Sequence, residues 1–124
     1  MVAGFGFAFT WGITSFRNSF FSKPVNKIIH VLCYALAIIC FSVGLKAVWK
    51  SHDDNLIANL YSLHSWIGLT AVILFGQNFL LGFYHFLNPS TPVQARQSYM
   101  PSHIFLGAMA FITAVIAVET GKII

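Results

Sequence analysis

The sequence contains very few charged residues. Only 8% of its 124 residues are charged and only three are acidic, whereas 57% are hydrophobic. Soluble domains carry roughly a quarter charged residues, so this composition excludes an ordinary water-soluble domain. The mean hydropathy of +0.76 points the same way. The chain is therefore expected to lie in a lipid bilayer.

Basic residues are also few, and they are spread along the chain. Seven lysines and arginines against three acids give a formal charge of +4. They form no dense cluster of the kind that nucleic acid binding needs, which excludes nucleic acid as a partner. Membrane topology explains them better, because cytosolic loops carry an excess of lysine and arginine.

Cysteine is scarce, and a leader segment is not evident. Cys33 and Cys40 fall in one apolar stretch, where we expect free buried thiols rather than a disulfide. No CxxCH motif occurs, so any haem would be held without a covalent link. The opening MVAGFGFAF has no basic n-region and no cleavage site, so a signal peptide is not expected.

Long apolar runs dominate what remains. They predict an all-α membrane protein, a single domain over residues 1–124 built as a four-helix trans-membrane bundle. The expected spans are about 1–16, 28–49, 60–87 and 100–118. The first is short for a crossing, which takes ~20 residues. SHDDN (residues 51–55) is expected to be a loop, and Pro101 to lie in the first turn of the fourth helix.

The polar loops between these runs differ in charge. Arg17, Lys23 and Lys27 lie in the 17–27 loop and Arg96 in the 88–99 loop, whereas the 50–59 loop carries Asp53 and Asp54. Alternation places the first two loops on one side of the membrane, and their basic charge makes that side cytosolic. Lys46 and Lys50 count against this orientation unless they reach the interface from a helix end.

Three histidines stand near the starts of apolar runs. His30 and His103 begin spans that rise from the cytosolic side, and His64 begins the span that enters from the opposite side. Two imidazoles at one depth suit the axial positions of a b-type haem, whereas zinc normally takes four ligands. The alternative is that each histidine hydrogen-bonds a neighbouring carbonyl or hydroxyl. His85 lies at the cytosolic end of the third span and His52 in the acidic outer loop, and neither receives a role from its position.

Glycines recur inside the spans, namely Gly44, Gly68, Gly76, Gly82 and Gly107. Small residues allow helices to approach closely in membranes, so we interpret these glycines as packing residues. They would also leave room for a flat macrocycle, which spacing alone does not establish.

Three stretches of the sequence resemble one known family. NLYSLHSWIGL (residues 59–69), LLGFYHFLNP (80–89) and MPSHIF (100–105) are similar to the eukaryotic cytochrome b561 family. Its members are six-helix membrane proteins that carry two b haems and pass electrons from cytosolic ascorbate across the bilayer. The resemblance covers essentially the whole chain.

The resemblance implies roles for particular residues. His30 and His103 match the ligands of the cytosolic haem, and His64 matches one ligand of the outer haem. The ascorbate site would comprise Lys23, Lys27 and Arg96, and the outer substrate site His52, Tyr61 and Asn59. The outer acceptor would be monodehydroascorbate or a ferric chelate. Homodimers are known in the family, although these helix faces do not establish one here.

The chain also departs from the family pattern. The family's first and sixth helices have no counterpart, and neither does the histidine expected just before Met1. A shortened product or fragment is therefore expected, in which only the His30–His103 haem has both ligands. The alternatives are a haem-free scaffold or interaction protein, and a haem-bearing anchor for a soluble oxidoreductase. Plasma, lysosomal and vesicle membranes are not distinguished.

Overall fold

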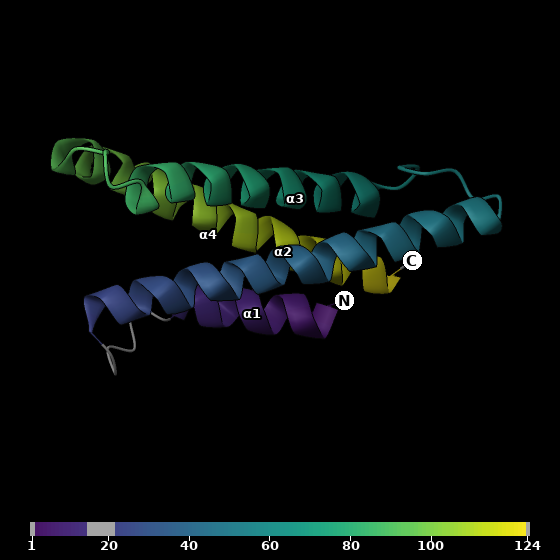
Figure 1. Ribbon diagram of the computed structural model, residues 1–124. Helices are drawn as coiled ribbons and strands as arrows, with labels where there is room; N and C mark the ends of the chain where they lie inside the picture. The colour runs from purple at the N-terminus through teal and green to yellow at the C-terminus, as the bar shows by residue number, and fades with distance from the viewer. Residues whose placement is uncertain (1, 15–21, 124) are drawn as a thin grey trace. The chain divides into compact units, whose positions relative to one another are not determined.

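The protein is helical throughout the part of the chain that the structure, a computed structural model, describes, which is residues 2–14 and 22–123 (Figure 1). The helices are α1 (Val2–Thr14), α2 (Lys23–Asp54), α3 (Leu63–Gly82) and α4 (Val93–Ile123), and a π-helical turn, η1 (Phe83–Leu87), continues α3. The described residues include no strand. This confirms the all-α fold expected from the sequence. Arg17 lies outside the described residues.

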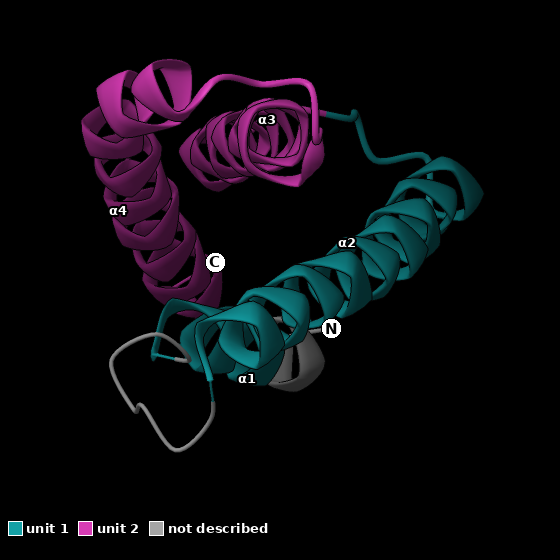
Figure 2. Cartoon of the chain, turned by 60° about the vertical axis from the view of Figure 1, so that its left-hand side comes forward, with its two compact units in different colours: residues 1–59 teal, residues 60–124 magenta. Residues whose placement is uncertain are grey.

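The chain divides into two compact units, residues 1–59 and 60–124, which are described separately (Figure 2). Unit 1 is the antiparallel pair α1 and α2, and unit 2 is the antiparallel pair α3 and α4 (Figure 1). Each unit buries mainly small and aromatic residues. Large aliphatic side chains are exposed instead, for example Leu32 at 63% and Ile39 at 60%. Aliphatic side chains facing outward are what a lipid-exposed helix requires.

Three of the described helical segments are long and apolar enough to cross a membrane: Lys23–Asp54, Leu63–Leu87 and Val93–Ile123. The described part of α1 has 13 residues. At 1.5 Å per residue it is about 20 Å long, shorter than the ~30 Å hydrocarbon core of a bilayer.

Two helix boundaries differ from the sequence-based expectation. Residues 51–54 form the last turn of α2, so the predicted SHDDN loop was wrong there; Lys50 Nζ lies 2.8 Å from Asp54 Oδ2 in an i,i+4 ion pair. The fourth helix begins at Val93, which places Pro101 inside it rather than in its first turn. Proline has no N–H, so one carbonyl of the preceding turn has no helical hydrogen-bond partner. Membrane helices tolerate such a proline because neighbouring helices and side chains can satisfy the freed carbonyl.

The turn before α4 explains its early start. Asn88 Oδ1 accepts a hydrogen bond from Ser90 N at 3.0 Å, and Asn88 O accepts one from Thr91 N at 3.2 Å. This local turn reverses the chain after Pro89, and Arg96 N then donates to Pro92 O at 3.2 Å. Arg96 is therefore in the first turn of α4 and not in a loop.

Unit 1 packs around one aromatic contact. The ring of Phe9 from α1 meets the ring of Tyr34 from α2 edge-on, with centroids 5.4 Å apart, and both residues are buried. Gly12 lies one turn further along α1, directly over the Tyr34 ring. An added Cβ at Gly12 would lie 2.7 Å from Tyr34 Cδ2, which is closer than two non-bonded carbon atoms approach each other.

We expect Gly12→Ala to destabilise unit 1. Tyr34 is held by Phe9 on one side and by the His30 ring, 4.6 Å away, on another, so it cannot turn aside freely. Overpacking of this kind costs about 1–3 kcal/mol. Thermal unfolding in detergent, followed by circular dichroism, measures the loss. Gly6→Ala is the control because a Cβ there meets no atom of unit 1 within 4 Å, and an equal loss in both variants would contradict the prediction.

Unit 2 packs through small residues and one amide. Ala71 and Phe75 of α3 and Ala110 and Ala117 of α4 are buried. Asn78 is also buried, with 5% of its surface exposed, in the middle of an apolar helix. Because a buried amide requires hydrogen-bond partners, Asn78 marks a place where α3 and α4 are fixed to each other.

Candidate functional site

His30 is held by the backbone of the neighbouring helix in unit 1. Its Nδ1 lies 2.6 Å from the carbonyl oxygen of Gly12. A carbonyl can only accept, so the hydrogen is on Nδ1 and the lone pair of the neutral ring is on Nε2. The Tyr34 ring covers one side of the imidazole, with centroids 4.6 Å apart. The ring is thereby fixed in both tautomer and direction.

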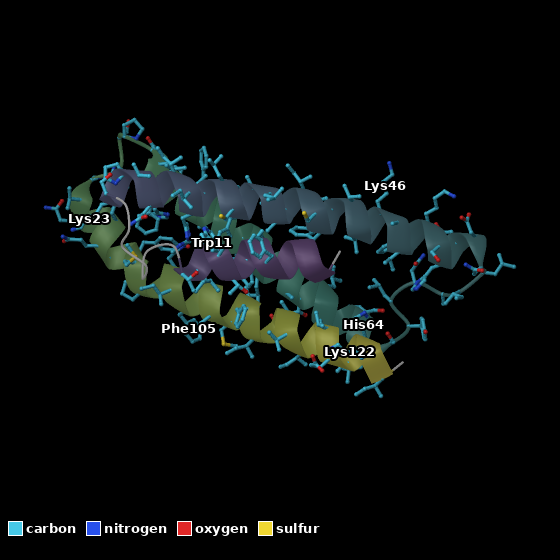
Figure 3. All side chains as sticks on the ribbon, turned by 90° about the horizontal axis from the view of Figure 1, so that it is seen from below. Trp11, Lys23, Lys46, His64, Phe105 and Lys122 are labelled. Carbon is cyan, nitrogen blue, oxygen red and sulfur yellow. The ribbon has the colours of Figure 1, made fainter. Side chains whose placement is uncertain are left out.

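His64 shows the same arrangement in unit 2. Its Nδ1 lies 2.7 Å from the carbonyl oxygen of Ala117 in α4, which again places the hydrogen on Nδ1. Figure 3 shows His64 beside the last turns of α4, near Lys122. Gly121 lies against the ring, where an added Cβ would be 2.8 Å from Cε1.

His103 lies between aromatic rings and a glycine. Phe86 meets its ring edge-on at a centroid distance of 5.2 Å, and Tyr99 is tilted against it at 6.1 Å. On the α3 side the ring faces Gly82, where an added Cβ would be 2.8 Å from Cε1. The imidazole therefore lies close to the backbone of the neighbouring helix, as the ring of His64 does.

Asn78 connects α3 to the turn of α4 that carries His103. Its Nδ2 donates to the carbonyl oxygen of His103 at 3.2 Å. Its Oδ1 is buried and has no hydrogen-bond partner among the described residues. A buried acceptor without a partner is uncommon, because it costs about 1–3 kcal/mol. Asn78 thus fixes the main chain at His103 from the opposite helix.

His85 differs from these three histidines. Its Nδ1 lies 2.8 Å from the carbonyl oxygen of Leu81, four residues earlier in its own helix, and its ring stacks on Tyr99 at 4.1 Å. This hydrogen bond stays within one helix, whereas those of His30 and His64 join two helices. The sequence-based interpretation gave His85 no role, and this interpretation stays a prediction.

The arrangement of His30 and His64 suits a metal-bound histidine. In such sites one ring nitrogen ligates the metal while the other donates to a backbone carbonyl or carboxylate. The described residues contain no group of three or more His, Cys, Asp or Glu side chains placed to hold a bare ion. A haem needs only one or two imidazoles, because the macrocycle supplies the other four ligands. The residues present therefore fit a haem, with Nε2 as the ligand atom.

The predicted ascorbate residues are distributed over both units. Lys23 and Lys27 lie one turn apart at the start of α2 in unit 1. Arg96 lies in the first turn of α4 in unit 2, where its Nη2 donates to Asn88 O at 3.1 Å. Its Nε is buried and has no acceptor among the described residues, so one donor of the guanidinium is not used within this part of the chain.

The predicted outer residues lie around the end of α2 and the segment that follows. His52 is in the last turn of α2, and its carbonyl accepts from Ile57 N at 2.9 Å. Asn59 Nδ2 donates to Asp53 Oδ1 at 2.9 Å, which holds this segment against the helix end. Tyr61, two residues later and already in unit 2, is 60% exposed.

Sequence reasoning missed Gly12, Gly121, Ala117 and Asn78, and it treated Gly82 only as a packing residue. The amide of Asn78 inside an apolar run was the available signal, since polar groups in membrane helices usually have a function. The glycines gave no such signal, because their contacts join residues far apart in the chain.

Comparison with known proteins identifies the family. The sequence model described as eukaryotic cytochrome b561 matches residues 1–123. The chain is 35% identical over 115 residues (93% of its length) to transmembrane ascorbate ferrireductase 1 of Arabidopsis thaliana. It is 42% identical over 100 residues (81%) to the transmembrane ascorbate-dependent reductase of Sus scrofa, and 41% identical over 95 residues (77%) to the lysosomal membrane ascorbate-dependent ferrireductase of Mus musculus.

These matches cover less than half of each relative. The chain spans 48% of the Arabidopsis protein and 39% of each of the other two. Together with the three candidate membrane helices, the family match makes the chain a multi-pass integral membrane protein. It belongs to the eukaryotic cytochrome b561 family.

Proposed function

We propose that this chain transfers electrons across a membrane through b-type haem, from cytosolic ascorbate to monodehydroascorbate or ferric iron on the opposite face. Membership of the family implies b-type haem. The observation that carries the proposal is that His30 and His64 each make the same kind of hydrogen bond, from Nδ1 to a carbonyl of the neighbouring helix. The names of the relatives as ascorbate-dependent reductases support the donor.

The proposed ligands are three imidazoles. His30 and His103 would ligate the cytosolic haem, and His64 would ligate the outer one. Support comes from the similar positions of His30 and His103, the eighth residue of α2 and the eleventh of α4, in two spans that are expected to rise from one side. A bound haem would supply reversible one-electron Fe(III)/Fe(II) chemistry. The chain would supply the imidazole nitrogens that hold the haem, and the Nδ1 bonds of His30 and His64 would fix the direction of their rings.

The proposed donor site is cationic. Ascorbate is a monoanion at neutral pH, and Lys23, Lys27 and Arg96 would attract and orient it. On oxidation the monoanion gives up one electron and one proton and becomes the monodehydroascorbate radical anion. The electron would go to the cytosolic haem and the proton to water.

The proposed acceptor site lies at the opposite end of α2. His52, Tyr61 and Asn59 would hold monodehydroascorbate, which takes one electron and one proton to become ascorbate again, or a ferric chelate, which takes one electron. The imidazole of His52 would donate that proton.

Lys27→Glu is expected to slow the reduction of the protein by ascorbate by about 10-fold or more, because charge at a site changes the association rate of an ion by this order. The haem spectrum should stay as in the parent, since Lys27 is not a ligand. Stopped-flow absorbance after mixing with ascorbate measures the rate. Lys46→Glu is the control on the same helix, nineteen residues further along. Equal rates of reduction in both variants would argue against the donor site. If the purified protein contains no haem, the haem-free scaffold becomes the better interpretation.

A further inference from the structure

Two glycines of unit 2 contact the two proposed ligand histidines in a reciprocal way. Gly82 of α3 lies against His103 of α4, and Gly121 of α4 lies against His64 of α3. An added Cβ at Gly82 would lie 2.8 Å from Cε1 and 3.1 Å from Nδ1 of His103. At Gly121 the corresponding distances to His64 are 2.8 Å and 3.0 Å. At both positions the imidazole therefore comes too close to the glycine for a Cβ to be added without a shift.

The backbone does not require glycine at either position. Gly82 has φ −63° and ψ −43°, which any residue adopts in a helix, and no described glycine has positive φ. Glycine in a helix is also less favourable than alanine. We therefore expect that the absence of a Cβ has a benefit that offsets this cost. At each position the three atoms nearest to an added Cβ all belong to the histidine ring.

Other helical glycines of the unit lack this contact. At Gly68 and Gly76 of α3 an added Cβ would meet no atom of unit 2 within 4 Å. Within unit 2, Gly68 and Gly76 therefore make no close contact with α4. The contact with histidine distinguishes Gly82 and Gly121 from these two.

A common spacing links each glycine to a bond between the helices. Gly121 follows Ala117 by four residues, and Ala117 O is the acceptor for His64 Nδ1. Gly82 follows Asn78 by four residues, and Asn78 Nδ2 donates to the His103 carbonyl. Residues four apart lie on one face of a helix, and a carbonyl points toward the residue four further on. A side chain at the glycine would therefore stand in the path of the ring.

We propose that Gly82 and Gly121 are positioning residues that seat His103 and His64 flat against the neighbouring helix and so set the direction of each Nε2. The inference rests on the proposed function, because it assigns those histidines as haem ligands. A Cβ would push each ring away from the neighbouring backbone. At His64 this would also lengthen the 2.7 Å bond that fixes the tautomer.

Gly82→Ala and Gly121→Ala test the proposal, with Gly76→Ala as the matched control on α3. Haem affinity is expected to fall about 10- to 100-fold in the first two variants, the range for partners that orient a metal-bound histidine. The low-spin EPR signal of the haem should shift, because it reports the orientation of the axial imidazole planes. The control should keep the parent's affinity and signal. Parent-like spectra and affinity in both test variants would overturn the proposal.

A double-variant cycle provides a readout that does not require haem. Gly121→Ala should lower the midpoint of thermal unfolding in the parent, but not in a His64→Ala background, where the ring that it would strike is gone. If Gly121→Ala alone fails to fold but the double variant folds, this outcome also supports the proposal. An equal loss in both backgrounds, including failure of both to fold, would show that Gly121 packs against something other than His64 and would overturn the proposal. Retention of all haem by His64→Ala and His103→Ala would instead refute the ligand assignment.

Discussion

His103→Ala is expected to lose the cytosolic haem, and His30→Ala should lose the same one. Each change removes one of the two proposed ligand nitrogens and would leave a single imidazole to hold this haem. The loss in affinity should exceed the about 10- to 100-fold that removal of an orienting partner costs, because the ligand itself is gone. The haem-to-protein ratio of the purified chain and its dithionite-reduced difference spectrum measure the outcome.

His85→Ala is the control for both variants. His85 lies on the same two-helix unit as His103 and also contacts Tyr99, but its Nδ1 bonds a carbonyl of its own helix. Its removal should leave haem content and spectrum as in the parent. Full haem content in His30→Ala or His103→Ala would refute the ligand assignment, whatever His85→Ala does.

The fold followed from the sequence because its helices are set by long apolar runs. Their ends were less predictable. Residues 51–54 are polar and were expected to form a loop, yet the Lys50–Asp54 pair lies along a last helical turn. Pro101 was expected to begin a helix, but the turn at Asn88 begins it eight residues earlier, at Val93. Helix ends depend on such local hydrogen bonds, which hydropathy does not report.

The candidate site was predictable in part. The positions of His30, His64 and His103 at the entrances of apolar helices indicated a function, since ionisable groups there are costly. Their hydrogen bonds were not predictable. His30 reaches a carbonyl 18 residues away and His64 one 53 residues away, so both bonds depend on how two helices pack. The role of a glycine as the seat of a ring depends on the same packing and leaves no pattern in the sequence.

His64→Ala is expected to stop electron transfer across the membrane while leaving the His30–His103 haem in place. His64 is the proposed ligand of the outer haem and is held by a different helix pair from His30. Removing the imidazole removes the outer relay, and the cytosolic haem would then accept an electron from ascorbate without passing it on. Proteoliposomes with ascorbate on the side of Lys23 and Lys27 and a ferric chelate on the other side measure both steps.

In this assay the cytosolic haem should become reduced at the parent rate, whereas ferrous iron should form no faster than in vesicles without protein. The contrast between the two readings separates a relay defect from a folding defect, because a misfolded chain would fail at both. His85→Ala should behave like the parent in both readings. Ferrous iron formation at the parent rate by His64→Ala would place the outward path elsewhere, since a chain without this imidazole would still carry the electron across the bilayer.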